Sequence, residues 1–234
     1  MVCSMRGLVI NLTGIFSFFR IPYNSLLMDT YLFPPKTTVV GIVGAALGWN
    51  EKTFLENIKN FKYGLILESI GEVLKETAVI YKNEDSPIYP ITKNMVYKPV
   101  YKIFLTSSND SLIESAYKAL QDPKYVLTLG DSENLVYPKT THFVKIMDIV
   151  EKPTDKLKCI LPSKIYNAYK HTLSIIKNDI LSPREIKIPV DFTGSGKKRR
   201  FIAENVFYYS GIELHFERPI QGVYDIDGDA VYLF

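Results

Sequence analysis

Hydrophobic positions in the first two-thirds of the chain alternate with polar ones in short segments typical of strands, and two segments instead show helical spacing. β-branched and aromatic residues are concentrated in the strand-like segments. The predicted strands are residues 7–11, 62–70, 73–81, 98–106 and a segment within 135–150. The predicted helices are residues 38–47 and 111–120, the second of which ends before Pro123. This order predicts an α+β protein with a ferredoxin-like (RRM-like, βαββαβ) domain.

Residues 82–97 separate two of these strands and contain two prolines and a charged start, which exclude a helix. The segment is longer than an ordinary turn, and its composition alone predicts a surface loop.

The composition changes after Pro153, which predicts a division into residues 1–152 and a smaller, β-rich region of residues 153–234. Apolar residues at three- and four-residue spacing predict a helix within residues 162–180. Short strands are predicted at residues 185–192, 200–209 and 212–216. Near the C-terminus, Asp227-Gly228 lies between alternating residues and predicts a two-residue hairpin turn.

The composition supports a folded core and excludes several classes of protein. Hydrophobic residues make up 47% and aromatic residues 13% of 234 residues, so the chain is not intrinsically disordered. The net charge of +3 argues against a purely electrostatic nucleic-acid binder but permits a local RNA track. Cys3 and Cys159 do not form a disulfide framework, and no cleavable signal or membrane span is apparent. We therefore expect a cytoplasmic protein.

The segment of residues 18–50 is the most informative part of the chain. A strand ends in Arg20, a loop closes with Pro34-Pro35, and Thr37 or Thr38 is expected to cap the following helix. Three glycines leave one face of that helix nearly bare, at a propensity cost near 1 kcal/mol each. Because this cost needs compensation, we expect the bare face to pack closely against another backbone or a partner. The glycines are Gly41, Gly44 and Gly48.

This arrangement resembles the opening of the fifth Cas family of CRISPR-associated proteins. The motifs that resemble those of the family are Phe19-Arg20-Ile21-Pro22, Pro34-Pro35-Lys36-Thr37-Thr38 and the helix from Gly41 to Gly48. A second segment, residues 127–136, is similar to the family's Leu-Gly-Arg-Ser-Glu phrase, with Asp131 where an arginine is common.

The resemblance implies a non-catalytic subunit of a type I Cascade complex in CRISPR antiviral defence. Such a subunit binds the 5′ handle of crRNA and contacts the backbone and large subunits of the complex. The resemblance also implies that residues 82–97 form a β-hairpin thumb that grips the RNA. The expected RNA-binding residues are Arg20, Lys36, Lys93, Lys197, Lys198, Arg199 and Arg200.

Arg20 is expected to bind a phosphate or a base edge through its planar guanidinium, although an ion pair with Asp29 is an alternative. The cluster Lys197–Arg200 follows Gly194-Ser195-Gly196 but is not a P-loop, because Lys198 occupies the Ser/Thr position and a strand follows. It is either a solvated hairpin tip or a phosphate clamp.

Two other functions remain open. Tyr137, Lys139 and His142 have the residue types of a metal-independent endoribonuclease that processes precursor crRNA. A ferredoxin-like protein-interaction module without RNA is the third possibility. No cofactor is expected, and Asp225–Asp229 is a turn rather than a calcium loop, because its glycine falls at the wrong position.

Overall fold

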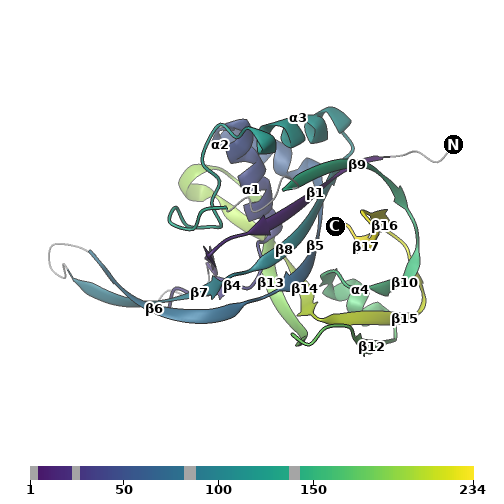
Figure 1. The fold of residues 1–234 in the computed structure, drawn as a ribbon. Helices are drawn as coiled ribbons and strands as arrows, with labels where there is room; N and C mark the ends of the chain where they lie inside the picture. The colour runs from purple at the N-terminus through teal and green to yellow at the C-terminus, as the bar shows by residue number, and fades with distance from the viewer. Residues whose placement is uncertain (1–4, 23–26, 82–87, 137–142) are drawn as a thin grey trace.

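A six-stranded antiparallel sheet forms the centre of the molecule (Figure 1). The computed structural model describes residues 5–22, 27–81, 88–136 and 143–234. The strand order is β17-β16-β9-β1-β8-β5. These strands are β1 (Met5–Thr13), β5 (Phe61–Ser69), β8 (Val100–Ser107), β9 (Val144–Glu151), β16 (Val223–Ile226) and β17 (Asp229–Tyr232). The predicted strands at residues 7–11, 62–70 and 98–106 are therefore confirmed in position, with shifts of one to two residues at most ends.

Both faces of this sheet are covered, which explains why the first strand is apolar at consecutive positions. Leu8, Ile10 and Leu12 of β1 face one hydrophobic core, whereas Val9 between them faces a second core. The first core includes the apolar residues of α1 (Lys36–Leu47) and α3 (Asp110–Gln121). The second includes residues of the C-terminal strands such as Leu214.

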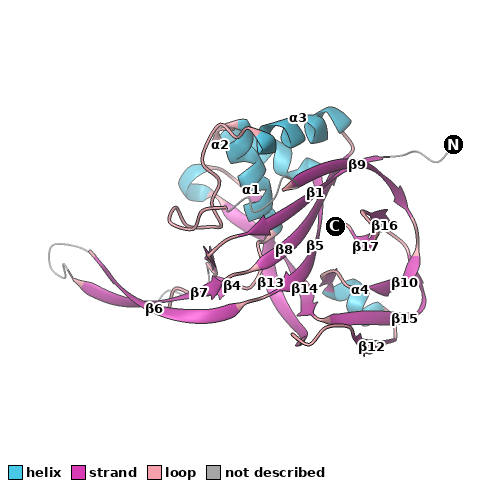
Figure 2. Cartoon of the chain, viewed as in Figure 1, coloured by secondary structure: helices cyan, strands magenta, loops and turns pink. Residues whose placement is uncertain are grey.

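Helices α1, α2 (Glu51–Asn57) and α3 gather on one side of the sheet (Figure 2). After α1, the short helix α2 begins at Asn50, whose side chain accepts a hydrogen bond from the Thr53 amide. A 3₁₀ turn, η1 (Ile58–Asn60), then leads into β5. Asn109 caps α3 in a similar way, because its side chain accepts a hydrogen bond from the Ser111 amide.

A long hairpin projects from the body of the molecule (Figure 1). It consists of β6 (Glu72–Ile80) and β7 (Tyr89–Tyr97), paired in register along their length. At its base, β2 (Phe16–Ser17) pairs with β7. The strand predicted at residues 73–81 therefore exists, but it pairs with β7 outside the central sheet. The loop predicted over residues 82–97 was wrong for its second half, because residues 89–97 form β7.

The C-terminal region contains two three-stranded sheets. One has the order β10-β15-β12 and the other β11-β14-β13. The strands are β10 (Thr154–Leu157), β11 (Leu161–Pro162), β12 (His171–Ile175), β13 (Leu181–Thr193), β14 (Arg200–Ser210) and β15 (Ile212–Ile220). The 3₁₀ turn η2 (Gly196–Lys198) lies at the tip between β13 and β14.

The helix predicted within residues 162–180 was largely wrong. Only α4 (Ser163–Ala168) is helical, and β12 follows it at His171. Residues 171–175 pair with residues 212–216 of β15, a partner about 40 residues away in sequence that local periodicity cannot reveal. Tertiary pairing thus overrides the local helical spacing.

The C-terminal hairpin returns to the central sheet. Asp227 and Gly228 form its turn with φ values of 55° and 78°, which fits the predicted two-residue turn with two positive φ angles. Tyr224 and Asp225 of β16 pair with Glu151 and Val150 of β9, so residues beyond the predicted division at 152 complete the same sheet as residues before it.

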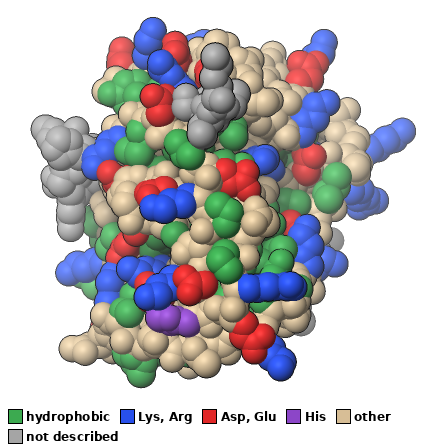
Figure 3. Space-filling view, turned by 90° about the vertical axis from the view of Figure 1, so that its right-hand side faces the viewer, with side chains coloured by type: hydrophobic (Ala, Val, Ile, Leu, Met, Phe, Trp, Pro, Cys, Tyr) green, Lys and Arg blue, Asp and Glu red, His purple; other side chains and the backbone are tan. Residues whose placement is uncertain are grey.

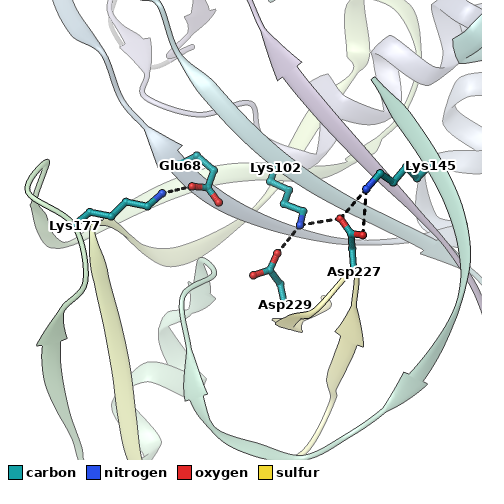
Figure 4. Close-up of polar contacts among 6 residues, drawn as sticks. All are labelled: Glu68, Lys102, Lys145, Lys177, Asp227 and Asp229. Carbon is teal, nitrogen blue, oxygen red and sulfur yellow. Dashed lines mark hydrogen bonds and ion pairs between the residues drawn. The ribbon is translucent and has the colours of Figure 1, made fainter. Parts of the chain in front are cut away.

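Ion pairs connect the C-terminal β16–β17 hairpin to strands β8 and β9 of the sheet (Figure 4). Lys102 of β8 lies 3.0 Å from Asp227 and 2.6 Å from Asp229, and Lys145 of β9 lies 3.3 Å from Asp227. Burial alone would lower the pKa of Lys102, but the hydrogen bonds to Asp229 and Asp227 raise it. The hydrogen bond from Lys102 is the main reason that the pKa of Asp227 is lowered. Glu68 and Lys177 form a further ion pair between β5 and the loop after β12.

Asp227→Asn should destabilise the fold by about 1 kcal/mol at neutral pH, because the amide keeps the turn but loses the charge-assisted bonds. The pKa of Asp227 is lowered from 3.8, so its contribution is complete above that value and is lost as the pH falls through the lowered pKa. Urea unfolding at several pH values should show that the difference in the free energy of unfolding between the variant and the wild type becomes smaller from pH 7 to pH 3. Asp225→Asn is the matched control, since the ion pair that the described residues give Asp225 is a long, exposed one with Lys152 at 3.4 Å. A constant difference at all pH values would contradict this assignment.

Candidate nucleic-acid interface

Three segments that are distant in sequence, together with Phe54 of α2, line one cleft of about 550 Å³. The first contains Arg20 and the start of α1, the second is the Gly130-Asp131 turn, and the third is the β13–β14 hairpin near its tip. The lining residues are Phe18, Phe19, Arg20, Pro22, Met28, Tyr31, Pro35, Thr37, Thr38, Phe54, Gly130, Asp131, Pro189, Phe192, Arg199 and Phe201. The cleft therefore unites both segments that resemble the fifth Cas family.

The N-terminus of α1 opens at this cleft. The predicted threonine cap is wrong: Pro35 is the N-cap residue, and no side chain caps the helix. The proline ring fixes an extended backbone before the helix, so the first amides, those of Lys36 and Thr37, keep no side-chain acceptor. Uncapped amides and the positive end of the helix dipole favour a negatively charged or hydrogen-bond-accepting ligand here.

Arg20 lies at the edge of the cleft with its side chain exposed. It belongs to β3 (Phe19–Arg20), which pairs with β4 (Thr30–Tyr31). The alternative ion pair with Asp29 is not formed, since that carboxylate accepts instead from the Thr30 amide and the Asn94 side chain. Among the described residues no carboxylate lies within ion-pair distance of the Arg20 guanidinium.

A tight turn brings Asp131 to the cleft. Gly130 has a φ of 98°, and a Cβ atom there would lie 1.9 Å from the Phe18 carbonyl oxygen. The Phe18 amide donates to the Leu129 carbonyl, so the turn packs directly on the strand that leads to Arg20. Only glycine permits this close approach with that backbone conformation.

Lys93, a predicted RNA contact, pairs with Asp131 instead. Its ammonium lies 2.6 Å from the Asp131 carboxylate and 4.7 Å from the centre of the Phe18 ring. The Lys93 side chain is only 8% exposed. The residue joins β7 to the Gly130-Asp131 turn, and in this arrangement its charge does not face solvent.

Arg199 is the member of the basic tip that lines the cleft. Its guanidinium pairs with Glu51 at 3.1 Å and lies 4.8 Å from the centre of the Phe192 ring. The rings of Phe192 and Phe201 lie 5.1 Å apart and form an aromatic wall. Lys197, Lys198 and Arg200 are exposed near the same tip but are not among the lining residues.

The sequence analysis missed Phe192 and Phe201, although a signal was present. The two phenylalanines flank the glycine- and lysine-rich tip at its two ends and pair directly across the hairpin. Aromatic residues interleaved with basic ones are typical of single-stranded nucleic-acid sites.

Lys36 is largely buried rather than presented to the cleft, with 9% of its surface exposed. Burial lowers its pKa, while nearby Asp191 and Glu204 act in the opposite direction. Lys36 was predicted to contact RNA, but in this structure its ammonium is not exposed to the cleft.

The three helix glycines lie in different environments. Gly48 is the C-cap of α1 with a φ of 71°, and Gly44 lies beneath Trp49 and Phe54 of the same chain. A Cβ atom on Gly41 would meet nothing within 4 Å. Gly41 lines two further grooves of about 370 and 240 Å³ beside exposed Tyr125 and Val126. Only Gly41 leaves an open helix face.

The possible ribonuclease residues Tyr137, Lys139 and His142 lie outside the described residues. Within the described ranges, no helix is long and apolar enough to cross a membrane. Charged side chains of both signs are interspersed on the face shown in Figure 3, so this face carries no broad basic track. The cleft is the better candidate for an RNA site.

Comparisons with known proteins agree with this geometry. The model of the CRISPR-associated protein (Cas_Cas5) family matches residues 7–172. No curated protein matches the sequence.

Solved structures with similar folds are also CRISPR proteins. A chain of a CRISPR RNA-guided surveillance complex is 12% identical with a TM-score of 0.60, and 91% of each chain is covered. A CRISPR protein from Archaeoglobus fulgidus is 14% identical with a TM-score of 0.55, covering 97% of this chain and 98% of that one. At such identities the likeness concerns the fold alone. The family match spans both the Arg20–Gly48 segment and the Gly130-Asp131 turn, and the chain therefore belongs to the CRISPR-associated protein (Cas_Cas5) family.

Proposed function

We propose that this protein is the subunit of a crRNA-guided CRISPR complex that binds the single-stranded 5′ handle of the guide RNA without cutting it. The observation that carries this proposal is the cleft, where Arg20, the uncapped start of α1 and the aromatic wall converge. The surveillance complex that contains a chain of similar fold supports the role of a complex subunit.

The cleft has the chemistry that a single strand requires. The Arg20 guanidinium and the amides at the start of α1 suit phosphate oxygens or base acceptors, and Phe192 and Phe201 offer ring faces for unstacked bases. Two cations near the cleft are paired with carboxylates, Lys93 with Asp131 and Arg199 with Glu51. Because their charge is partly neutralised, we expect shape and hydrogen bonding to contribute more to RNA affinity than long-range attraction.

The strand order β9-β1-β8-β5 with two helices on one face supports a ferredoxin-like assignment for residues 1–152. In this proposal the β6–β7 hairpin is the thumb and lies against the same cleft through Lys93 and Asp131. Residues 153–234 form the smaller β-rich region, whose tip adds Arg199 and the aromatic wall.

The direct test is purification of the complex from its native host, followed by sequencing of the bound RNA. The proposal expects a common repeat-derived 5′ end, and the isolated chain should shift a synthetic RNA of that sequence in a gel. Absence of RNA and of other subunits would contradict it. Discrete cleavage of the repeat RNA by the isolated chain, lost in His142→Ala, would instead favour the endoribonuclease.

The open face of α1 around Gly41 is proposed to contact a neighbouring subunit. Gly41→Leu should leave the melting temperature of the isolated chain unchanged or raised, because the new side chain meets no neighbour, but should weaken assembly. Gly44→Leu is the matched variant on the same helix and should destabilise the isolated chain by about 1–3 kcal/mol, since Trp49 lies 3.1 Å from the added Cβ. Thermal melting and co-purification separate the two effects. Normal assembly of Gly41→Leu would refute the contact.

A further inference from the structure

Asp131 is the only acidic side chain among the described residues that line the cleft. Its side chain is 40% exposed. A carboxylate beside a polyanion repels the phosphates, so it is unfavourable in an RNA cleft unless donors on the RNA approach it. Bases carry such donors, and phosphates do not.

The surroundings hold Asp131 in one orientation. Oδ2 accepts from the Lys93 ammonium at 2.6 Å, and Oδ1 accepts from the Ser132 amide at 3.2 Å. Lys93 is in turn fixed between the carboxylate and the Phe18 ring. The backbone of the turn is fixed as well, since Gly130 lies against the Phe18 carbonyl.

Each carboxylate oxygen retains acceptor capacity after these contacts. A carboxylate has about four lone-pair positions, and one on each oxygen is used by Lys93 or Ser132. At least one acceptor position on each of the two oxygens therefore remains for a ligand. A carboxylate with capacity on both oxygens can accept from two neighbouring N–H donors on one edge of a ligand.

We propose that Asp131 recognises a guanine base of the bound strand by accepting hydrogen bonds from its N1–H and N2–H₂ groups. This inference rests on the proposed RNA-binding function. Guanine has two adjacent donors on its Watson–Crick edge, whereas adenine and cytosine have one amino group beside an acceptor, and uracil has one N–H between two carbonyls. Asp131 is thus a specificity-determining residue, and Lys93 is the positioning residue that holds it.

The test compares oligouridines that carry a single guanosine, moved through each position, with the same RNAs carrying inosine, which lacks the 2-amino group. Binding to the full chain is measured by fluorescence anisotropy at one salt concentration. At one position, the wild type should bind the guanosine RNA on the order of tenfold more tightly than the inosine RNA, because one charge-assisted hydrogen bond is lost. Equal binding at every position would overturn the proposal without any variant.

Two variants of the same ion pair separate base recognition from a structural role. Asp131→Asn exchanges one acceptor oxygen for a donor and should reduce the ratio between guanosine and inosine RNA to near one. Lys93→Met keeps the carboxylate but removes the ammonium that orients Oδ2, so the ratio should fall only part of the way and stay above that of Asp131→Asn, even if the melting temperature and both affinities fall. If Asp131→Asn lowered the affinity for both RNAs equally and left the ratio unchanged, the role of Asp131 would be limited to its ion pair with Lys93 of β7. If the wild type bound none of these RNAs, the proposed RNA-binding function itself would fail, and this inference with it.

Discussion

Replacing Gly130 with alanine is expected to destabilise the protein by about 3 kcal/mol. The methyl group would lie 1.9 Å from the Phe18 carbonyl oxygen and 2.7 Å from its carbon, and the backbone would keep a φ of 98° that alanine rarely adopts. Both the turn and the strand before Arg20 would have to shift. Equilibrium unfolding in urea measures the loss.

Gly41→Ala is the matched control, since it adds the same methyl group at a glycine with no neighbour within 4 Å. It lies inside α1 and should stabilise the chain by up to about 1 kcal/mol through helix propensity. A Gly130→Ala variant as stable as the wild type would mean that the close approach of the turn to Phe18 is not required.

Replacing Arg20 with alanine is expected to weaken binding of the handle RNA by 1–3 kcal/mol, about 5- to 150-fold, with little change in stability. The guanidinium is exposed at the cleft, and no described carboxylate pairs with it. Arg20→Lys should recover only part of the affinity, because an ammonium lacks the planar pair of donors. Anisotropy titrations and thermal melting of the same samples provide both readouts.

Arg218→Ala is the control for the loss of one positive charge. Arg218 lies on β15 over the Tyr169 ring, away from the residues that line the cleft. Equal losses of affinity in the Arg20 and Arg218 variants would show that only net charge matters, and the cleft would then lose its assigned role.

The family resemblance could be recognised from sequence because it rests on local features. The Arg20–Pro22 motif, the Pro34-Pro35 pair and the glycines at 41, 44 and 48 are short motifs within about 30 consecutive residues, so each can be read locally. The Asp227-Gly228 turn could be predicted for the same reason, since two adjacent residues set its φ angles. The family match over residues 7–172 confirms the resemblance.

Features that depend on distant partners could not be predicted. Nothing near Lys93 in sequence shows that its ammonium lies on Asp131, because the two residues meet only when β7 packs beside the second family-like segment. Likewise, residues 171–175 have helical spacing but form β12, because β15 provides a pairing edge. Lys36 was expected to face RNA, and burial beneath the β13–β14 sheet removes its exposure.

The sequence by itself determined the apolar strands, the C-terminal turn and the family, since each depends on neighbouring residues and on backbone preferences. Only the tertiary structure decided which charges remain available. No carboxylate of the described residues pairs with Arg20, whereas Lys93 and Arg199 are paired by Asp131 and Glu51. The physical reason is that the electrostatic role of a side chain depends on burial and on partners within about 4 Å, and the folded chain brings these partners from segments far apart in sequence.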